Sequence, residues 1–383
     1  MPKLIRVTTV PMALKVLLPG QLKYMKEQGF EVIMVSADGK ERDDVIRNEE
    51  VPHHIIPMTR KITPVADLHS LWRLYRFFKK EKPDIVHSHT PKAGLLAMFA
   101  AKMAGIEIRI HTIAGLRFMT AAGFTRKVLL TMEKLTGKWA TQIWPNSFSL
   151  LEYIRFHKLI AASKMEVIGQ GSSNGINLAR YSARALDHDK LAVIKKLIGY
   201  DDTLTYFLCV GRIVKDKGID ELLYAFTRLY AKDNTTRLIL VGVFEDHLDP
   251  VTNEARQILQ THPGIIQPGW SDDVEYFMHL SFALVHPSHR EGFPNVLLQA
   301  GAMLCPIICS RIEGNVDVVE HEKTGLLFEA RNREDLLKQL EKAITNPQVL
   351  QQYTGQLRAR IEQHFNMQVV HKLVAQKYKA LLQ

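Results

Sequence analysis

Residues 205–218, TYFLCVGRIVKDKG, join a continuous apolar run to a glycine and a basic loop, and a helical pattern follows. Similar short apolar runs alternate with helical patterns along the whole chain. They lie at residues 4–10, 31–36, 85–89, 108–113 and 142–145 and, beyond the run at 205–210, at residues 238–241, 265–267, 282–286 and 306–309. This alternation is typical of α/β chains and predicts doubly wound parallel sheets with helices on both faces.

The chain length and one small-residue segment divide this pattern into two domains. A chain of 383 residues is longer than one ordinary core supports and suits two domains. Residues 169–175, GQGSSNG, are rich in glycine and serine and separate the two series of strands. We expect a hinge there, between domains at residues 1–170 and 171–366. Ligands of parallel sheets bind beyond the carboxyl ends of the strands, so the residues after each strand carry the candidate chemistry.

The composition is that of a soluble globular protein in a reducing compartment. Hydrophobic residues make up 46% of the chain and charged residues 23%. Cys209, Cys305 and Cys309 all lie in apolar runs, which favours buried thiols over a zinc site. The N-terminus shows no signal-peptide pattern, and the longest apolar stretch, residues 93–106, contains Lys102 and is too short to span a bilayer. We therefore expect a cytoplasmic protein that does not cross a membrane.

The positive charge is concentrated in the N-terminal half. Residues 1–170 contain 26 Lys and Arg against 15 Asp and Glu, whereas the remainder contains 24 against 25. Segments 71–82 and 124–144 also mix aromatic residues with cations, which suits a surface resting on anionic lipid headgroups. Each segment alone is better explained by a helix with core aromatics and solvated cations. The overall asymmetry favours a peripheral membrane location, and no nucleic-acid-binding module is recognisable.

The first chemical motif follows the strand at residues 205–210. Gly211 allows a tight turn, and Arg212 and Lys217 are left on the loop beyond the sheet edge. An arginine fork and a lysine point charge can neutralise a diphosphate without a metal ion. The alternative interpretation is a solvated basic loop.

The second motif is HPSHREGFPN at residues 286–295, again between a strand and a helix. Pro294 suits the first helical position, which would leave backbone amides facing an anion at the positive helix end. Glu291 and Gln299 could reach one ligand, although an ordinary surface acid and a solvated helical glutamine explain them as well. The amides predicted to bind the anion are those of Gly292, Phe293 and Asn295.

Together these motifs resemble the C-terminal half of the family 4 glycosyltransferases, which are retaining enzymes. The match extends to NGIN at residues 174–177, GWS at 269–271 and TGLLF at 324–328. The resemblance implies the GT-B fold: two Rossmann-like domains that face a cleft, the first for the acceptor, the second for the donor, with a final helix at 367–383 returning to the first. It also implies transfer of a hexose or N-acetylhexosamine from a UDP-sugar to a polyprenyl-diphosphate-linked sugar, as in bacterial polysaccharide assembly, with no further cofactor.

By the same resemblance, individual residues acquire roles. Arg212 and Lys217 would hold the donor diphosphate, and Glu291 would contact the transferred sugar. The family places a second glutamate eight residues later, where this chain has Gln299, whose amide can still hydrogen-bond a ribose.

The N-terminal half departs further from the family pattern. Ala114 occupies the position where the family usually has a histidine. His111, three residues earlier, is the candidate substitute for that histidine. The family's double-glycine loop is also replaced, by VPMA at residues 10–13. Two rival functions therefore remain: a UDP-sugar 2-epimerase-like enzyme and a non-catalytic nucleotide-sugar-binding subunit.

Three further residues point towards the acceptor. His87 and His89 follow the apolar pair at residues 85–86, where either could touch a sugar hydroxyl or instead cap the next helix. Lys92 could bind an acceptor phosphate or lie in solvent. Asp187 and Asp189 form an Asp-x-Asp pair, but no apolar strand precedes them, so we expect no metal site there.

Overall fold

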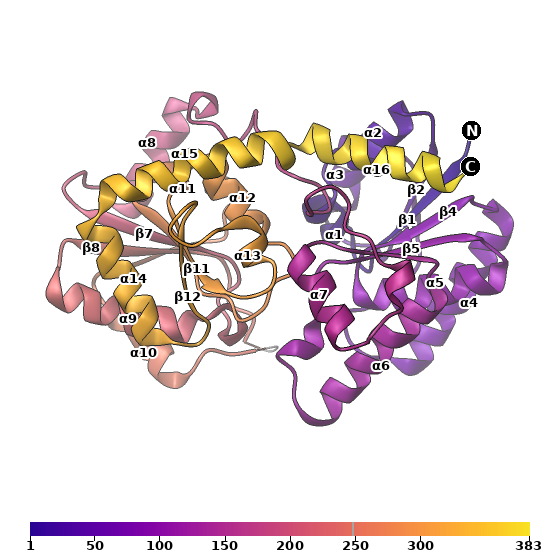
Figure 1. Ribbon diagram of the computed structural model, residues 1–383, viewed down its shortest axis with the longest axis horizontal. Coiled ribbons are helices and arrows are strands. Elements are labelled where there is room, and N and C mark those ends of the chain that lie inside the picture. Colours follow the sequence, from indigo (N-terminus) through magenta and orange to yellow (C-terminus); the bar gives the residue numbers. More distant parts are fainter. Residues whose placement is uncertain (247–248) are drawn as a thin grey trace. The chain divides into compact units, whose positions relative to one another are not determined.

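The computed structural model describes residues 1–246 and 249–383, which form two compact units (Figure 1). Unit 1 contains residues 1–175 and 367–383, and unit 2 contains residues 176–366. The chain passes between them at Gly175, a few residues beyond the boundary predicted at 170–171. Segment 171–175 stays with unit 1 because Ser172 N donates to Asn146 O (2.8 Å) and Gln21 Nε2 donates to Ser173 O (2.7 Å).

Unit 1 is built on a parallel six-stranded sheet in the order β3-β2-β1-β4-β5-β6. Its strands are β1 (Lys3–Val7), β2 (Glu31–Ser36), β3 (His53–Ile55), β4 (Ile85–Ser88), β5 (Ile108–Ile113) and β6 (Gln142–Pro145). Its helices are α1 (Pro11–Leu17), α2 (Gln21–Glu27), α3 (Arg42–Glu49), α4 (Pro64–Glu81), α5 (Pro91–Ala104), α6 (Gly123–Trp139), α7 (Phe148–Phe156) and α16 (Met367–Leu381).

Each face of this sheet has its own apolar core, because successive strand side chains point to opposite faces. Leu4 packs in the core that includes Leu22 of α2 and Tyr378 of α16. Ile5, the next residue, packs in the core that includes Leu74 of α4 and Ala97 of α5. The final helix therefore completes the α2 side of unit 1, although nearly two hundred residues of unit 2 precede it in the chain.

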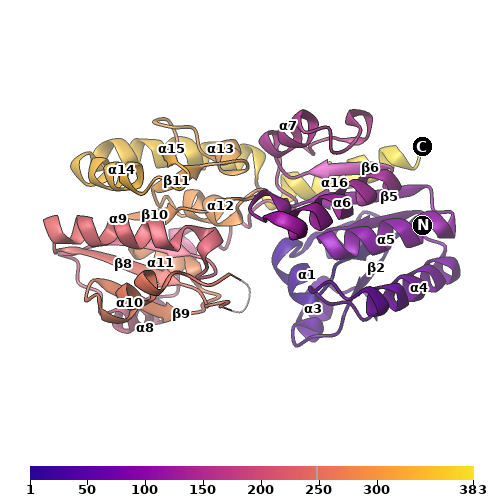
Figure 2. The ribbon, with the colours of Figure 1, turned by 90° about the horizontal axis from the view of Figure 1, so that it is seen from below.

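Unit 2 repeats this architecture with the order β12-β11-β10-β7-β8-β9, and helices again lie on both sides of the strands (Figure 2). Its strands are β7 (Thr205–Val210), β8 (Thr236–Val241), β9 (Ile265–Gly269), β10 (Ala283–His286), β11 (Ile307–Arg311) and β12 (Leu326–Glu329). Its helices are α8 (His188–Ile198), α9 (Ile219–Lys232), α10 (Asn253–Thr261), α11 (Val274–Leu280), α12 (Asn295–Ala302), α13 (Asn315–Val318), α14 (Arg333–Thr345) and α15 (Pro347–His364).

The predicted α/β class with two doubly wound parallel sheets is confirmed. The sequence pattern did not predict the two edge strands β3 and β12. Pro294, expected at the first helical position, precedes α12, which begins at Asn295. Among the described residues, no helix is both long and apolar enough to cross a membrane.

Candidate active site

Two loops of unit 2 meet because the strands that precede them are neighbours in the sheet. β7 pairs with β10, so the loops at residues 211–218 and 287–294 leave the same sheet edge. Gly218 has φ +69°, and a Cβ there would lie 2.0 Å from the carbonyl oxygen of Pro287. His289 N also donates to Asp216 O at 2.9 Å. Only a glycine permits this approach, so the loops of the two predicted motifs form one structure.

The centre of this structure is a carboxylate shared by two nitrogen groups. Lys217 Nζ and His286 Nε2 both contact Glu291 Oε1, the histidine at 3.1 Å. Burial alone would raise the pKa of Glu291, but the Lys217 ammonium and the His286 imidazole hold it well below its usual range. Burial lowers the pKa of His286, and the bond to Glu291 opposes this only in part. A neutral His286 with its proton on Nε2 therefore donates to an ionised Glu291.

Two polar contacts tie the second loop to residues on either side of Lys217, one to the first loop and one to the first turn of α9. Arg290 Nε lies 2.6 Å from Asp216 Oδ2, and His289 Nε2 lies 3.1 Å from Glu221 Oε1. The sequence motifs gave these four residues no role, although Asp216 lies in the first motif and His289 and Arg290 lie in the second. For Asp216 and Arg290, opposite charges on loops that follow neighbouring strands were the available signal.

The other predicted diphosphate ligand, Arg212, also has a carboxylate partner. Its Nη1 lies 2.7 Å from Glu245 Oε2, on the loop that follows β8. Gly242 begins that loop, and a Cβ there would lie 1.7 Å from Gly211 O. Glu245 was missed because the loop matches no motif, but β8 is adjacent to β7, and the rule that ligands bind at the strand ends would have included it.

The turn that leads into α12 leaves the N-terminus of the helix without a side-chain cap and places one aromatic ring in the core. Gly292, Phe293 and Pro294 lead into the helix, and no side chain caps its N-terminus. The Phe293 ring is buried and packs against Phe365 at a centroid distance of 5.2 Å, so its ring is structural. A Cβ on Gly314 would lie 2.7 Å from Gly292 O, which brings a third loop against this turn.

Gln299 lies one turn into α12 and is already oriented by a buried tyrosine. Its Nε2 donates to the hydroxyl of Tyr181 at 2.7 Å, and burial raises the pKa of that hydroxyl to about 12. The remaining amide oxygen is an acceptor, as a ribose-binding role requires. Tyr181 comes from a loop without a recognisable pattern, and sequence reasoning missed it.

In unit 1, the two acceptor-side histidines surround a buried arginine. His87 Nδ1 lies 2.9 Å from Arg6 Nη1, and His87 Nε2 lies 2.7 Å from Thr112 Oγ1. His89 Nε2 lies 3.2 Å from Arg6 Nη2. Burial and then the positive Arg6 hold the pKa of both imidazoles well below the usual value, so both are neutral. They line a cavity of 20 Å³, which accommodates about one water molecule.

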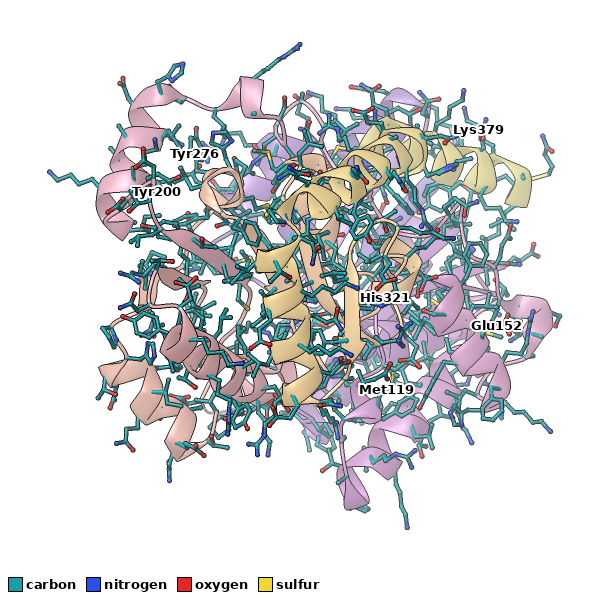
Figure 3. All side chains as sticks on the ribbon, turned by 60° about the vertical axis from the view of Figure 1, so that its left-hand side comes forward. Met119, Glu152, Tyr200, Tyr276, His321 and Lys379 are labelled. Carbon is teal, nitrogen blue, oxygen red and sulfur yellow. The ribbon has the colours of Figure 1, made fainter. Side chains whose placement is uncertain are left out.

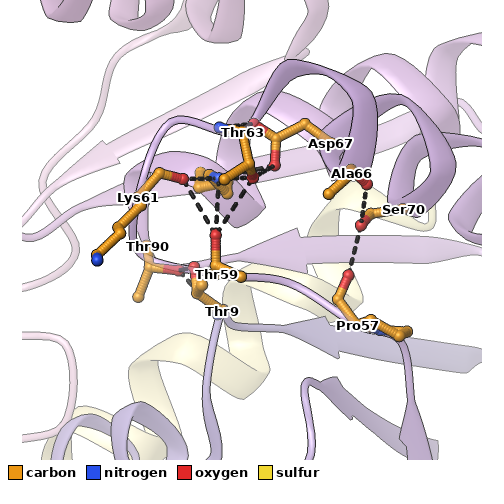
Figure 4. Close-up of polar contacts among 10 residues, drawn as sticks. Thr9, Pro57, Thr59, Lys61, Thr63, Ala66, Asp67, Ser70 and Thr90 are labelled. Atoms are coloured by element: carbon orange, nitrogen blue, oxygen red, sulfur yellow. Dashed lines mark hydrogen bonds and ion pairs between the residues drawn. The ribbon is translucent and has the colours of Figure 1, made fainter.

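Lys92 holds a surface segment in place through several contacts, and Figure 4 labels its partners Thr59, Lys61, Thr63 and Asp67. Its Nζ lies 2.7 Å from Asp67 Oδ1, donates to Lys61 O, and approaches the hydroxyls of Thr59 and Thr63 at 3.4 and 3.3 Å. The side chain is buried. These contacts give Lys92 a structural role, and the predicted contact with an acceptor phosphate stays a prediction.

His111 lies within β5 and faces α5. Its Nδ1 is 2.9 Å from Ser88 Oγ, and a Cβ on Gly94 would lie 2.4 Å from its Cε1. Burial lowers its pKa to about 4. The ring thus fills space that the glycine of α5 leaves, while its substitution for the family histidine at Ala114 stays a prediction.

The rejected Asp-x-Asp pair has a local structural explanation. Asp187 caps α8, because its side chain accepts from Lys190 N at 2.8 Å. Its own backbone amide donates to the hydroxyl of Tyr276 at 3.0 Å (Tyr276 is labelled in Figure 3). Among the described residues, no cluster of three or more His, Cys, Asp or Glu side chains is placed to hold a metal ion.

Two family models match successive parts of the chain. The model described as "Glycosyl transferase 4-like domain" matches residues 18–171, and that described as "Glycosyl transferases group 1" matches residues 193–363. The capsular polysaccharide biosynthesis glycosyltransferase CapM of Staphylococcus aureus is 34% identical over 367 residues, or 96% of this chain and 94% of that protein. The UDP-Gal:alpha-D-GlcNAc-diphosphoundecaprenol alpha-1,3-galactosyltransferase of Escherichia coli is 27% identical over 356 residues, or 91% and 88%.

A solved structure shares the fold. Alr3699/HepE of Anabaena, in complex with UDP-glucose, superimposes with a TM-score of 0.83 over 99% of this chain and 100% of that chain. Its sequence identity is 16%, so this likeness concerns the fold alone.

Proposed function

Because the chain belongs to the family 4 glycosyltransferases, which have the GT-B fold, we propose that it transfers a hexose or an N-acetylhexosamine from a UDP-sugar to a polyprenyl-diphosphate-linked sugar, with retention of configuration. This reaction would serve the assembly of a bacterial polysaccharide or lipid-linked glycan. The observation that carries the proposal is the Lys217–Glu291 pair, which joins the two contacting motif loops beside the start of α12.

The proposed chemistry uses the diphosphate as both leaving group and proton acceptor. The bond from the anomeric carbon to the phosphate oxygen breaks, and a bond from that carbon to the acceptor oxygen forms. The acceptor oxygen attacks the anomeric carbon directly, so no side chain forms a covalent intermediate. The acceptor's proton passes to the leaving phosphate. Arg212, Lys217 and the amides at the start of α12 would stabilise the charge that develops on the diphosphate. Glu291 would contact the sugar, and Gln299 the ribose.

The names of two relatives support this choice of substrates. The E. coli relative is named for a UDP-galactose donor and a diphosphoundecaprenol-linked acceptor, and the S. aureus relative for capsular polysaccharide biosynthesis. The test is a panel of UDP-sugars incubated with and without a lipid-linked acceptor, with UDP release as the readout. Release that depends on acceptor supports transfer. Epimerised donor without sugar transfer, or binding without turnover, would favour one of the two rivals.

We also propose that transfer needs no metal ion, since Arg212 and Lys217 supply the positive charge that a metal would provide. EDTA should then leave the transfer rate nearly unchanged. Loss of most activity, restored by manganese, would contradict this proposal and return attention to Asp187 and Asp189.

The proposed location is the inner face of the plasma membrane, with unit 1 resting on anionic lipid. Helix α4 presents three apolar residues spaced three and four apart: Val65, Leu68 and Trp72 are 85, 67 and 52% exposed. Phe124, at the start of α6, is exposed as well, whereas Phe78 is buried in the core. The exposed Trp72 and Phe124 are thus accessible to a membrane surface, whereas Phe78 belongs to the core. The cations around the α4 ridge are exposed: Arg60, Lys61, Arg73, Arg76, Lys79 and Lys80.

An apolar ridge bordered by cations matches an anionic bilayer, because the ridge can enter the headgroup layer while the cations meet the phosphates. Lys92 supports this surface from beneath through its contacts with residues 59–67. Replacing Arg73, Arg76, Lys79 and Lys80 with serine should abolish most salt-sensitive binding to phosphatidylglycerol vesicles and leave UDP binding intact.

A matched control removes the same charge elsewhere. Arg184, Lys195, Lys196 and Lys338 are exposed cations of unit 2, and their replacement with serine should leave vesicle binding unchanged. Co-sedimentation at low and high salt is the measurement. A wild-type protein that stays in the supernatant at low salt would make a soluble acceptor the better hypothesis.

A further inference from the structure

We propose that Glu245 is a resident counter-ion of Arg212 that competes with the donor's diphosphate, so that Glu245 weakens nucleotide binding. This inference rests on the proposed function, since it takes Arg212 to be a diphosphate ligand. Nothing in the sequence motifs assigns a role to Glu245.

The contact itself is well formed. Arg212 Nη1 and Glu245 Oε2 are 2.7 Å apart, a distance typical of charge-assisted hydrogen bonds. The Arg212 side chain is 39% exposed and that of Glu245 is 20% exposed, so a ligand can reach the arginine while the carboxylate remains beside it.

The backbone holds Glu245 in this position. Ile213 N donates to Val243 O at 2.8 Å, and Ile213 forms a bridge with Phe244. Gly242 approaches Gly211 so closely that a Cβ would not fit between them. The two loops are therefore in contact along their backbones, and the ion pair is not a chance encounter of two long surface side chains.

Both predicted diphosphate cations are thus neutralised within unit 2. Lys217 contacts Glu291, and Arg212 contacts Glu245. Glu245 occupies Nη1 of Arg212. A diphosphate that binds through Nη1 must replace the carboxylate there, and one that binds through the other guanidinium nitrogens is repelled by the carboxylate beside it. Glu291 has a proposed role towards the sugar that offsets this competition, whereas the position of Glu245 suggests competition alone.

The direct test is calorimetric titration of UDP into the wild-type chain and the variant Glu245→Gln. Removing a partly exposed counter-ion should tighten UDP binding by about two- to fivefold, the range of exposed ion pairs. Affinity for uridine, which carries no phosphate, should not change. Glu245→Ala should tighten UDP binding similarly, and Glu245→Asp, which keeps the charge, should resemble the wild-type protein.

The matched control is Asp246→Asn. Asp246 is the next residue and pairs with Arg256 at 2.7 Å, so its removal changes the net charge equally without releasing Arg212. Unchanged or weaker UDP binding by Glu245→Gln, or equal tightening by Asp246→Asn, would overturn the inference. A wild-type protein that binds no UDP would instead refute the proposed donor site on which the inference rests.

Discussion

Replacing Lys217 with methionine should destabilise unit 2 and reverse the pH dependence that Glu291 contributes. Lys217 is the main cation that opposes the burial of Glu291. Breaking a buried ion pair by removing one partner costs about 3–5 kcal/mol. The two side chains are 22 and 16% exposed and His286 would remain, so we expect the lower end, about 3 kcal/mol at pH 7.5.

The sign of the pH effect follows from the direction of each pKa shift. In the wild-type chain the pKa of Glu291 lies below its unfolded value, so its stabilisation is present above that value and is lost as pH falls. In Lys217→Met burial dominates, the pKa rises above the unfolded value, and protonation on acidification restores stability. The difference in unfolding free energy between the two proteins should therefore shrink steadily from pH 7.5 to pH 4.

Urea denaturation at several pH values measures this difference, and the transition that UDP shifts identifies unit 2. Turnover of Lys217→Met should fall on the order of a hundredfold or more, because a preorganised charge at the leaving group is lost. Lys323→Met is the control, since Lys323 forms an exposed pair with Glu320 and should matter by less than about 1 kcal/mol. Equal stability of Lys217→Met and wild type, or a difference that grows on acidification, would refute the reasoning.

Three further outcomes are expected. Arg212→Ala should lower both UDP affinity and turnover, the latter on the order of a hundredfold; near wild-type kinetics would remove Arg212 from the diphosphate site. Gln299→Glu should keep donor affinity, because the Tyr181 hydroxyl can rotate and donate to the new carboxylate, whereas Gln299→Ala should weaken donor binding more than it slows turnover. Glu133 is buried, one of its oxygens lacks a partner, and burial raises its pKa to about 7. Glu133→Gln should therefore stabilise the protein by up to about 3 kcal/mol at pH 8 and have little effect at pH 4. Urea titrations at both pH values measure this, and equal stability of variant and wild type at pH 8 would contradict it.

The fold was predictable where strands are buried on both faces. β7 and β10 lie at the centre of their sheet and read as continuous apolar runs. β3 contains a single apolar residue, Ile55, and exists because Met34 and its neighbours on β2 offer a free edge to pair with. Such an edge strand depends on its partner, which local sequence does not reveal.

The candidate site was predictable as a set of residues but not as a set of contacts. Lys217 and Glu291 were both singled out, yet they are 74 residues apart in the chain, and their pairing depends on the strand order that places β7 beside β10. Tyr181 and Glu245 lie on loops without a motif, so only the folded chain brings them to Gln299 and Arg212. Tyr181 and Glu245, which the sequence did not indicate, are the hydrogen-bond partners that orient the predicted Gln299 and Arg212.

These partners explain how the proposed donor site can be rigid before any ligand binds. Gly218 allows the two motif loops to touch, and the Asp216–Arg290 and Glu221–His289 pairs hold them together on either side of Lys217. A cation fixed in this way stabilises a leaving diphosphate without reorganising during the reaction. The same fixation keeps carboxylates beside the cations, which by our proposal weakens binding of the ground-state nucleotide. A site of this kind gives up some donor affinity, and its advantage lies in charge that is already in place when the glycosidic bond to the diphosphate breaks.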